Sequence, residues 1–380
     1  ESANFELHCP LLEKMLNHSL NKDTHVNLLV VSVLGLVSCL GILENALVLW
    51  VLGFRLRRKT VAAVWVINLA LSDFLATLTL PLFTYYFSVG HSWELGQALC
   101  SAEASIFFLN MYVSAFLLAA ISLDRCLLVV KPVWSQNQRT VEAAWKVCLL
   151  GWLWAGFNTV PYFLFRNVTV KRDKRKLCYH NFALYSSPAT LEFDCKLRQA
   201  ATAVSKALLA FLVPLVVIAS RFTKMVASVI ATFALCWAPY HFFCLLEVAA
   251  QYFPSESYLV KLVEQGLPLS SVFAFLNPVL NPIIYTFSCP HFCTRIRQSL
   301  GLLFEGLVEE AGPLVLATSR IIRRDPNSPT SPSSLSSPTT PTLLRLPRLS
   351  QGSNPYKLCN ITKKTLSLSL SLTFLSFFSL

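Results

Sequence analysis

Charged residues are scarce in this chain of 380 residues: Asp, Glu, Lys and Arg together make up 14% of it, against about 25% in an average soluble domain. Apolar residues make up 54%, and the mean hydropathy is +0.54. This composition excludes an ordinary water-soluble globular protein. The net charge is +12, yet most basic residues flank apolar stretches, and this pattern argues against a nucleic-acid-binding protein.

Three further features are lacking. The apolar stretches contain no metal-ligand spacing and no nucleophile–base constellation, so we do not expect an enzyme. No internal repeat of the kind found in many transporters is evident, which argues against transport. No basic-then-apolar leader precedes the first apolar stretch, so we expect that stretch itself to direct membrane insertion.

Seven long apolar stretches dominate the chain. Each reaches the roughly 20 residues that a helix needs to cross the ~30 Å hydrocarbon core of a membrane. They cover residues 26–52, 61–89, 100–130, 143–165, 200–220, 225–250 and 258–287. The expected fold is therefore an all-α membrane protein, a bundle of seven transmembrane helices whose termini lie on opposite sides.

The basic residues predict the orientation of this bundle. Cytoplasmic loops carry an excess of Lys and Arg, and such residues lie here between the first and second stretches, between the third and fourth, and after the seventh. Asn17 and Asn167 each begin an N-glycosylation sequence, and both fall on the opposite side. We therefore expect a plasma-membrane glycoprotein that crosses the membrane several times and has an extracellular N-terminus.

The remaining chain divides around the bundle. Residues 1–25 are expected to form a short extracellular segment, and residues 26–287 form the bundle itself. Residues 288–305 carry apolar side chains at helical spacing with basic residues between them, which predicts a short amphipathic eighth helix. Residues 306–380 are rich in Ser, Thr and Pro, a composition that predicts a disordered cytoplasmic tail with phosphorylation sites. We assign no function to the last sixteen residues.

Asp73 lies midway along the second stretch, and a carboxylate at membrane depth needs partners. Side chains that bear oxygen lie four residues apart on one face of the third stretch and on one face of the seventh. These are Asn110 and Ser114, and Asn277 and Asn281. Hard oxygen ligands around one carboxylate suit a sodium ion; the alternative is a hydrogen-bonded network with a structural role.

The sequence Asp124-Arg125-Cys126 lies near the end of the third stretch. An ionic pair where a helix leaves the membrane is costly and points to a functional role. One marker lies in each of the other six stretches: Asn45, Asp73, Trp152, Pro214, the sequence Cys236-Trp237-Ala238-Pro239 and the sequence Asn281-Pro282-Ile283-Ile284-Tyr285. In this order, across residues 30–300, the set closely resembles the rhodopsin-like G-protein-coupled receptors.

This resemblance implies roles for the markers. In that family the Asp124-Arg125 position meets a heterotrimeric G protein, and the Trp237 position lies beneath the ligand. The segment that ends in Tyr285 rearranges on activation. Pro239 and Pro282 each remove a helix hydrogen bond, and such kinks can act as pivots of a two-state bundle.

The resemblance also implies covalent links and partners. A disulfide between Cys100 and Cys178 is typical of the family. Binding of arrestin through the phosphorylated tail is implied as well.

Lys206 lies within the fifth stretch, eight residues before Pro214 and hence about 12 Å outward of it. Its amine either extends to the membrane surface or is a buried cation that awaits an anion. A basic run follows the fourth stretch in the predicted outer loop: Arg166, Lys171, Arg172, Lys174, Arg175 and Lys176. This run is either solvated or forms, together with Lys206, an electropositive entrance for an acid.

Aromatic residues face the same outer half of the bundle as Lys206. They are Phe83, Phe87, Phe107, Phe108, Tyr240 and Phe275. An apolar cavity with one buried cation suits the carboxylate of a fatty acid better than an amine. Amine receptors of the family carry an Asp at the position of Phe107, so the absence of an acid there argues against a biogenic amine.

Longer segments resemble one branch of the family, the chemoattractant-type receptors for prostaglandin D2. These segments are 89–96, 105–111, 120–126, 158–163 and 208–214. The resemblance implies a lipid acid of the prostaglandin D2 class as ligand, chemotactic or inflammatory signalling, and a G protein of the inhibitory class. It implies four residues around the carboxylate and a second disulfide: Arg166, Lys206, Tyr179 and Tyr240, with Cys9 bonded to Cys195. His180 stands where that branch has a tyrosine, and a histidine can still donate to a carboxylate.

The connection between the fifth and sixth stretches is unusually short. Pro214 and Trp237 are 23 residues apart, too few for both helices to reach their usual lengths in this family. We expect a tight turn at 220–224 and interpret the junction at Ser220-Arg221 as the loss of a block. Two alternative functions remain: a receptor for another chemoattractant, such as a peptide with a free carboxylate, and a lipid-binding form that does not signal.

Overall fold

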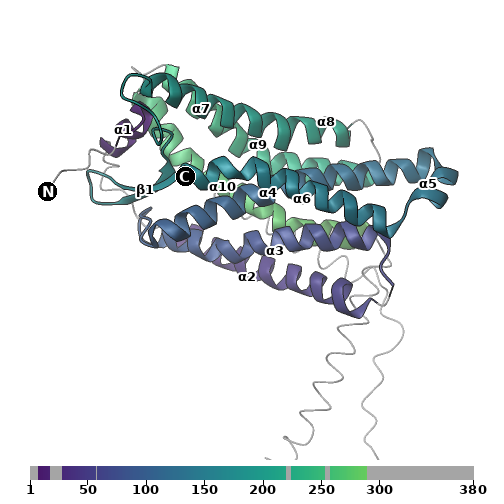
Figure 1. Ribbon diagram of the computed structural model, residues 1–380. Helices are drawn as coiled ribbons and strands as arrows, with labels where there is room; N and C mark the ends of the chain where they lie inside the picture. Colours follow the sequence, from purple (N-terminus) through teal and green to yellow (C-terminus); the bar gives the residue numbers. More distant parts are fainter. Residues whose placement is uncertain (1–6, 18–27, 57, 220–223, 253–256, 289–380) are drawn as a thin grey trace, which may run out of the picture. The chain divides into compact units, whose positions relative to one another are not determined.

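The structure is a computed structural model (Figure 1), and it describes residues 7–17, 28–56, 58–219, 224–252 and 257–288. Within these ranges nearly all regular structure is helical, and a single two-stranded sheet is present. The tail expected at 306–380 lies outside the described residues. So does the amphipathic helix expected at 288–305, apart from its first residue.

Seven helices of the described part are long and apolar enough to cross a membrane. In chain order they are α2 (Leu28–Trp50) continued by the π-helix η1 (Val51–Arg55), α3 (Val61–Ser88), α4 (Gly96–Val130), α6 (Val141–Leu164), α7 (Leu191–Ser205) continued by the π-helix η2 (Lys206–Leu212) and by α8 (Val213–Ala219), α9 (Lys224–Tyr252) and α10 (Ser257–Ser288). The expected seven-helix, all-α fold is confirmed.

Helix α4 occupies the middle of the bundle. It packs against α3, α6, α8 and η2, while α10 packs against α2, α3 and α9. Large apolar side chains are exposed on the outer helices, among them Leu43, Leu150, Phe157 and Val216. Helices that are apolar on all sides are typical of membrane spans, whose outer faces meet lipid rather than water.

Asn45 joins α2 to the part of α10 that contains Pro278 and Pro282. Its side-chain amide donates to the main-chain oxygen of Pro278, with a nitrogen–oxygen distance of 3.0 Å. In a regular helix this oxygen would accept from the N–H four residues later, but that residue is Pro282, which has no N–H. Since no water is available inside a bilayer, the side chain of Asn45 supplies the missing donor. Trp152 similarly joins α6 to α3 by donating to Asn68 Oδ1 at 3.1 Å.

An antiparallel hairpin follows α6, and the sequence analysis did not predict it. Strands β1 (Arg166–Val170) and β2 (Lys176–His180) pair with Arg166 opposite His180. The β-branched run Val168-Thr169-Val170 favours a strand. The predicted disulfide between Cys100 and Cys178 is confirmed, and it ties β2 to the start of α4.

The N-terminal segment contains a helix, α1 (Pro10–Asn17), where the sequence analysis expected only a short extracellular segment. One face of α1 is apolar: Leu12 packs beside the disulfide between Cys9 and Cys195, and Met15 packs against α9 and α10. The second predicted disulfide is thereby confirmed. We call the end of the bundle that carries α1, the β1–β2 hairpin and the start of α7 the hairpin end (Figure 1).

The fifth span begins at Leu191 rather than at residue 200, which corrects the sequence analysis. Its first turns carry Glu192, Asp194 and Lys196, and these charges lower the local hydropathy. They still suit a helix, because Glu192 pairs with Lys196 four residues later at 2.7 Å. At the other end α8 stops at Ala219, and α9 begins at residue 224. The short turn between them lies outside the described residues.

Candidate ligand cavity and switch residues

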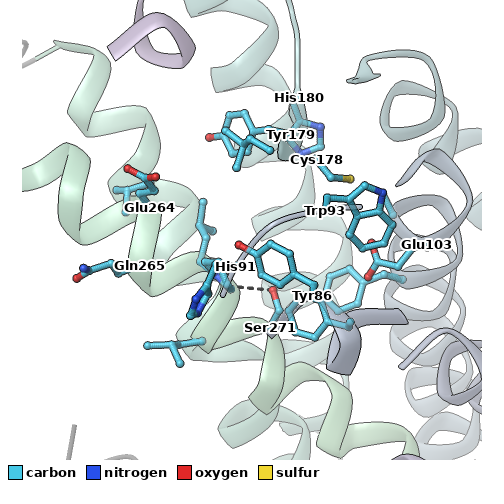
Figure 2. A pocket seen from close by; sticks show the side chains of 18 of the residues that line it. Tyr86, His91, Trp93, Glu103, Cys178, Tyr179, His180, Glu264, Gln265 and Ser271 are labelled. Atoms are coloured by element: carbon cyan, nitrogen blue, oxygen red, sulfur yellow. Dashed lines mark hydrogen bonds between the residues drawn. The ribbon is translucent and has the colours of Figure 1, made fainter. Parts of the chain in front are cut away.

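A cavity of about 540 Å³ lies at the hairpin end (Figure 2). Its size falls in the range of small-molecule sites. Figure 2 shows Tyr179 and His180 of β2 on one side, Glu264 and Gln265 of α10 on a second side, and Glu103 of α4 across from Glu264. All residues predicted to contact a ligand line this cavity: Phe83, Phe87, Phe107, Phe108, Arg166, Tyr179, His180, Lys206, Tyr240 and Phe275. Their role in binding stays a prediction.

Aromatic rings form the inner wall of the cavity. The ring of Phe107 lies 5.0 Å from that of Phe275, 5.4 Å from Tyr240 and 5.7 Å from Trp237, measured between centroids. Trp237 is 1% exposed. Phe107 therefore lies between the cavity and Trp237. A ligand that displaces the Phe107 ring would also change the packing contacts of Trp237.

Lys206 is buried in this wall, with 4% of its surface exposed. Its ammonium nitrogen lies 5.1 Å from the ring centroid of Phe108, 5.3 Å from that of Tyr162 and 5.5 Å from that of Tyr240. The nitrogen donates to Cys244 Sγ at 3.4 Å, and Lys206 forms no ion pair with a carboxylate in the described part of the chain. The structure thus excludes the interpretation in which this amine reaches the membrane surface.

The helix geometry changes at Lys206. The π-helix η2 begins there, and Ala207 and Ala210 are buried beside it. A π-helical turn is wider than an α-helical turn and is frequent at functional sites. The small alanine side chains let the helix pack closely against α4 and α9, and this packing holds the lysine in the bundle interior.

Arg166 and His180 face each other across the hairpin. An Arg166 guanidinium nitrogen lies 3.3 Å from His180 Nε2. Burial lowers the pKa of His180 well below its usual value, and the positive charges of Arg166 and Lys206 lower it further. The ring is therefore neutral at pH 7: Nε2 accepts from Arg166, which leaves Nδ1 as the protonated nitrogen. That nitrogen has no hydrogen-bond partner in the described residues.

The electropositive entrance is weaker than the sequence predicts. Three of the basic loop residues are paired with carboxylates: Lys171 with Glu264, Arg175 with Asp173, and Lys176 with Glu94. The first pair is buried and joins the hairpin to α10. Only Arg172 and Lys174 are exposed as a solvated run would require. The loop is therefore neither a fully solvated run nor a fully electropositive entrance, because half of its basic residues are paired with carboxylates within the fold.

Glu247 is a cavity residue that the sequence analysis missed. It lies on α9, lines the cavity, and is 5% exposed. Its Oε1 atom has no hydrogen-bond partner among the described residues. The sequence contained an indication of this role, since an ionisable residue within a membrane span points to a functional site. Glu103 on α4 lines the same cavity and is 6% exposed.

The predicted Asp73 cluster is brought together in the middle of the bundle. Asn110 donates to Asp73 Oδ1 at 2.9 Å, and Ser114 donates to the same oxygen at 3.4 Å. Asn281 donates to Asp73 Oδ2 at 2.9 Å and to Asn277 Oδ1 at 3.3 Å. Asp73 is fully buried. The carboxylate, hydroxyl and amide oxygens gathered here are hard ligands, and their chemistry fits a sodium ion.

At the opposite end of the bundle, Asp124 binds Arg139. Arg139 follows the short helix α5 (Pro132–Gln138) and precedes Thr140, which caps α6. Its Nε and a terminal nitrogen donate to the two oxygens of Asp124 at 2.7 and 2.9 Å. Arg139 is one of the basic residues between the third and fourth spans that predicted the orientation, and the sequence analysis did not predict this pairing.

The prolines that were predicted to permit kinks in the sixth and seventh spans lie within α9 and α10, and the kinks themselves stay a prediction. Pro239 is inside α9, and Pro278 and Pro282 are inside α10. The backbone of α10 includes residue 285, but the side chain of Tyr285 lies outside the described part, so its predicted role is not addressed.

Both glycosylation sequences lie at the hairpin end. Asn17 is exposed at the end of α1. Asn167 is half-buried on β1. Their placement on one end agrees with the expectation that both face the same side of the membrane, and glycosylation itself stays a prediction.

Comparison with known proteins assigns the family. The family described as "7 transmembrane receptor (rhodopsin family)" matches residues 44–220 and 219–285. The chain belongs to this family.

Prostaglandin D2 receptor 2 of Rattus norvegicus is 46% identical over 337 residues, which cover 83% of each chain. Its counterpart of Mus musculus is 46% identical over 323 residues, 80% of this chain and 84% of the other. Chemerin-like receptor 1 of Homo sapiens is 34% identical over 309 residues, 74% and 81% of the two chains.

The chain is thus a seven-span G-protein-coupled receptor of the chemoattractant type, and it is not an enzyme. Its family implies a ligand and a G protein as partners. The family match is divided into two parts that overlap at residues 219 and 220. This is the position at which the sequence analysis placed a missing block, and the loss itself stays a prediction.

Proposed function

We propose that this receptor binds a lipid carboxylic acid of the prostaglandin D2 class in the cavity at the hairpin end. The observation that carries the proposal is the ammonium group of Lys206, which lies among aromatic rings and has no carboxylate partner in the described residues. An unpaired charge in such surroundings is costly. The carboxylate of a ligand would remove that cost, while its hydrocarbon chain packs against the aromatic wall.

Other cavity residues offer further donors to the same ligand. Three donor atoms lack a hydrogen-bond partner in the described part of the chain: Arg166 Nε, Tyr179 Oη and His180 Nδ1. Buried donors are seldom left unpaired in proteins. Together they suit a ligand rich in oxygen acceptors, as an oxygenated fatty acid is. The similarity to the rat and mouse receptors named above supports the same class.

The remaining parts of the proposal concern signalling. The hairpin end faces the outside of the plasma membrane, and the end that holds Arg125 and Arg139 meets an inhibitory-class G protein. Arrestin binds through the phosphorylated tail. A sodium ion held by Asp73 and its neighbours favours one of the two states of the bundle. Support comes from the positions of the basic residues, the exposed Asn17, and the oxygen ligands around Asp73.

Binding of labelled prostaglandin D2 to membranes that contain the wild type or Lys206→Ala tests the ligand assignment. Removing one partner of a buried charge pair costs on the order of 3 kcal/mol, so we expect the variant to bind about 100-fold more weakly. Lys196→Ala is the matched control, because Lys196 lies on the same span, does not line the cavity, and forms an ion pair with the exposed Glu192.

The methyl ester of the ligand identifies the group that Lys206 recognises. The ester lacks the negative charge, so we expect it to bind the wild type and Lys206→Ala with similarly low affinity. Equal loss of acid and ester binding in the variant would contradict a carboxylate contact. Failure of prostaglandin D2 to compete, with competition by a peptide that has a free C-terminal carboxylate, would favour the peptide alternative.

A further inference from the structure

We propose that Cys244 is a covalent capture site within this cavity, which takes lipid acids that carry an α,β-unsaturated carbonyl group. The proposal rests on the proposed function, because the ligand must first enter the cavity as an acid. It adds a chemical step that reversible binding does not include. The sulfur of Cys244 would attack the β-carbon of the unsaturated group and hold the ligand in place.

Cys244 differs from the other free cysteines in its position. It lines the cavity, and its Sγ atom lies 3.4 Å from the ammonium nitrogen of Lys206. The other free cysteines in the described residues do not line the cavity: Cys39, Cys126, Cys148 and Cys236. Cys244 is 1% exposed. A reagent that stays in bulk water therefore does not reach it, whereas a ligand inside the cavity does.

Cys244 shares one feature with reactive thiols, namely an ammonium group next to its sulfur. Reactive cysteines occur beside lysine, arginine or protonated histidine, because the attacking species is the thiolate. Here the neighbour is an ammonium group whose hydrogen bond in the described part of the chain goes to this sulfur.

A second observation on the same helix points to a ligand. Glu247 lies three residues after Cys244, and positions three apart share one face of a helix. Glu247 also lines the cavity, and its buried Oε1 atom has no hydrogen-bond partner in the described residues.

The spacing of the two groups fits an unsaturated carbonyl compound. Its carbonyl oxygen would accept from Lys206 at about 2.9 Å. The β-carbon lies two bonds beyond the carbonyl carbon, so it comes next to the sulfur beside that ammonium group. In such a ligand Lys206 binds the carbonyl oxygen in place of the carboxylate that it binds in a simple acid, and the carboxylate binds Arg166, which also lines the cavity.

The reaction is a simple addition. A carbon–sulfur bond forms at the β-carbon, the carbon–carbon π bond breaks, and negative charge moves to the carbonyl oxygen. Lys206 stabilises this oxyanion by donating to it. The proton released by the thiol ends on the α-carbon. No atom leaves, and no oxidant or reductant is required.

The test uses the full-length receptor in membranes and two probes. One is a long-chain fatty acid with an α,β-unsaturated ketone in mid-chain, and the other is its saturated ketone counterpart. After incubation and washing, mass spectrometry of receptor peptides locates any adduct. We expect a mass increase equal to the intact unsaturated probe on the peptide that contains Cys244, and no increase with the saturated probe.

Three variants sharpen the test. Cys244→Ser removes the nucleophile and should abolish the adduct, while Cys148→Ser, at a buried cysteine away from the cavity, should leave it unchanged. Lys206→Gln should slow the addition about tenfold or more, because it removes the donor to the oxyanion. Reversible binding of the saturated probe to Cys244→Ser shows that this variant is folded.

The outcomes separate the two proposals. If the saturated probe binds reversibly and the unsaturated probe washes out completely, covalent capture is overturned and the lipid-acid receptor stands. An adduct that forms equally on Cys39, or that persists when a saturated acid fills the cavity, also overturns it. If neither probe binds the wild type, both proposals fall.

Discussion

Arg139 holds both carboxylate oxygens of Asp124, with nitrogen–oxygen distances of 2.7 and 2.9 Å. The pair joins the end of α4 to the turn between α5 and α6. Two parallel hydrogen bonds between a guanidinium group and a carboxylate fix direction as well as distance. The charged group that the sequence marks at Asp124-Arg125 is therefore held from a second element, fifteen residues further along the chain.

Arg139→Ala is expected to destabilise the receptor. The side chain of Asp124 is 10% exposed, so the variant leaves a largely buried carboxylate without its partner, at a cost of about 1–3 kcal/mol. The melting temperature of the purified receptor should fall by a few degrees. Lys146→Ala is the control: its pair with Glu142 is exposed and contributes little. Equal melting temperatures for the two variants would show that the Asp124–Arg139 pair is unimportant for stability.

Asp73→Asn is expected to abolish the effect of sodium on ligand binding. In the wild type we expect agonist affinity to drop about fivefold or more when sodium replaces a bulky cation, a coupling typical of two-state proteins. The asparagine keeps the size of the side chain and removes its charge. Agonist competition in the two salts measures the effect. If wild type and variant respond alike, the cluster is a hydrogen-bonded network without an ion.

His180 should make the stability of the receptor depend on pH. Its folded-state pKa is lowered by burial and by the charges of Arg166 and Lys206. Below about pH 6.5 the unfolded chain binds a proton that the folded receptor does not, so stability falls as the pH drops through that value.

The contribution of His180 is at most about 1.4 kcal/mol for each pH unit below 6.5. His180→Gln removes the titrating group, and it should therefore show a smaller loss of melting temperature between about pH 7 and about pH 5 than the wild type. Identical pH profiles for the two proteins would contradict the buried, neutral histidine.

The short connection between Ala219 and Lys224 should limit signalling. We expect the chain to bind its ligand but to stimulate nucleotide exchange on an inhibitory-class G protein only weakly. Measured side by side with the rat prostaglandin D2 receptor 2, its exchange rate should be about tenfold lower. The reason is that each 1.4 kcal/mol of contact energy lost with the G protein weakens its binding by a factor of ten. Equal exchange by both receptors would show that the inner ends of the fifth and sixth helices are dispensable.

The origin of this junction is open to a separate experiment. We expect sequencing of the transcript across Ser220-Arg221 to reveal a longer form with additional residues at this point, in agreement with the division of the family match there. An uninterrupted genomic exon that carries the same junction would refute the loss of a block.

The spans and the Asp73 cluster could be predicted from the sequence because both follow from local patterns. A membrane demands about 20 consecutive apolar residues, whatever the rest of the fold does. The helical repeat places Asn110 with Ser114, and Asn277 with Asn281, on common faces. A buried carboxylate needs polar partners, so these side chains were the expected neighbours of Asp73.

The strands and charge pairs of the hairpin end could not be predicted from local patterns in the same way. The strands β1 and β2 flank a strongly basic turn, which hides their β-branched pattern. Residues of this turn find partners far along the chain, as Lys171 does with Glu264. The pairing of Arg139 was missed for the same reason, since a single sequence shows which charges exist but not which of them meet. Glu247 was overlooked although its position within a membrane span pointed to a functional site.

The main-chain oxygen of Pro278 is bound by Asn45 of α2 instead of by an N–H of its own helix. Because Pro282 lacks that N–H, a movement of the inner part of α10 breaks no helix hydrogen bond at this position. The movement would have to carry with it the Asn45 amide, whose contact is worth about 1 kcal/mol net, and the bond from Asn281 to Asp73. Bending of the seventh helix at this point is therefore coupled to the Asp73 cluster, so a change in either should be transmitted to the other.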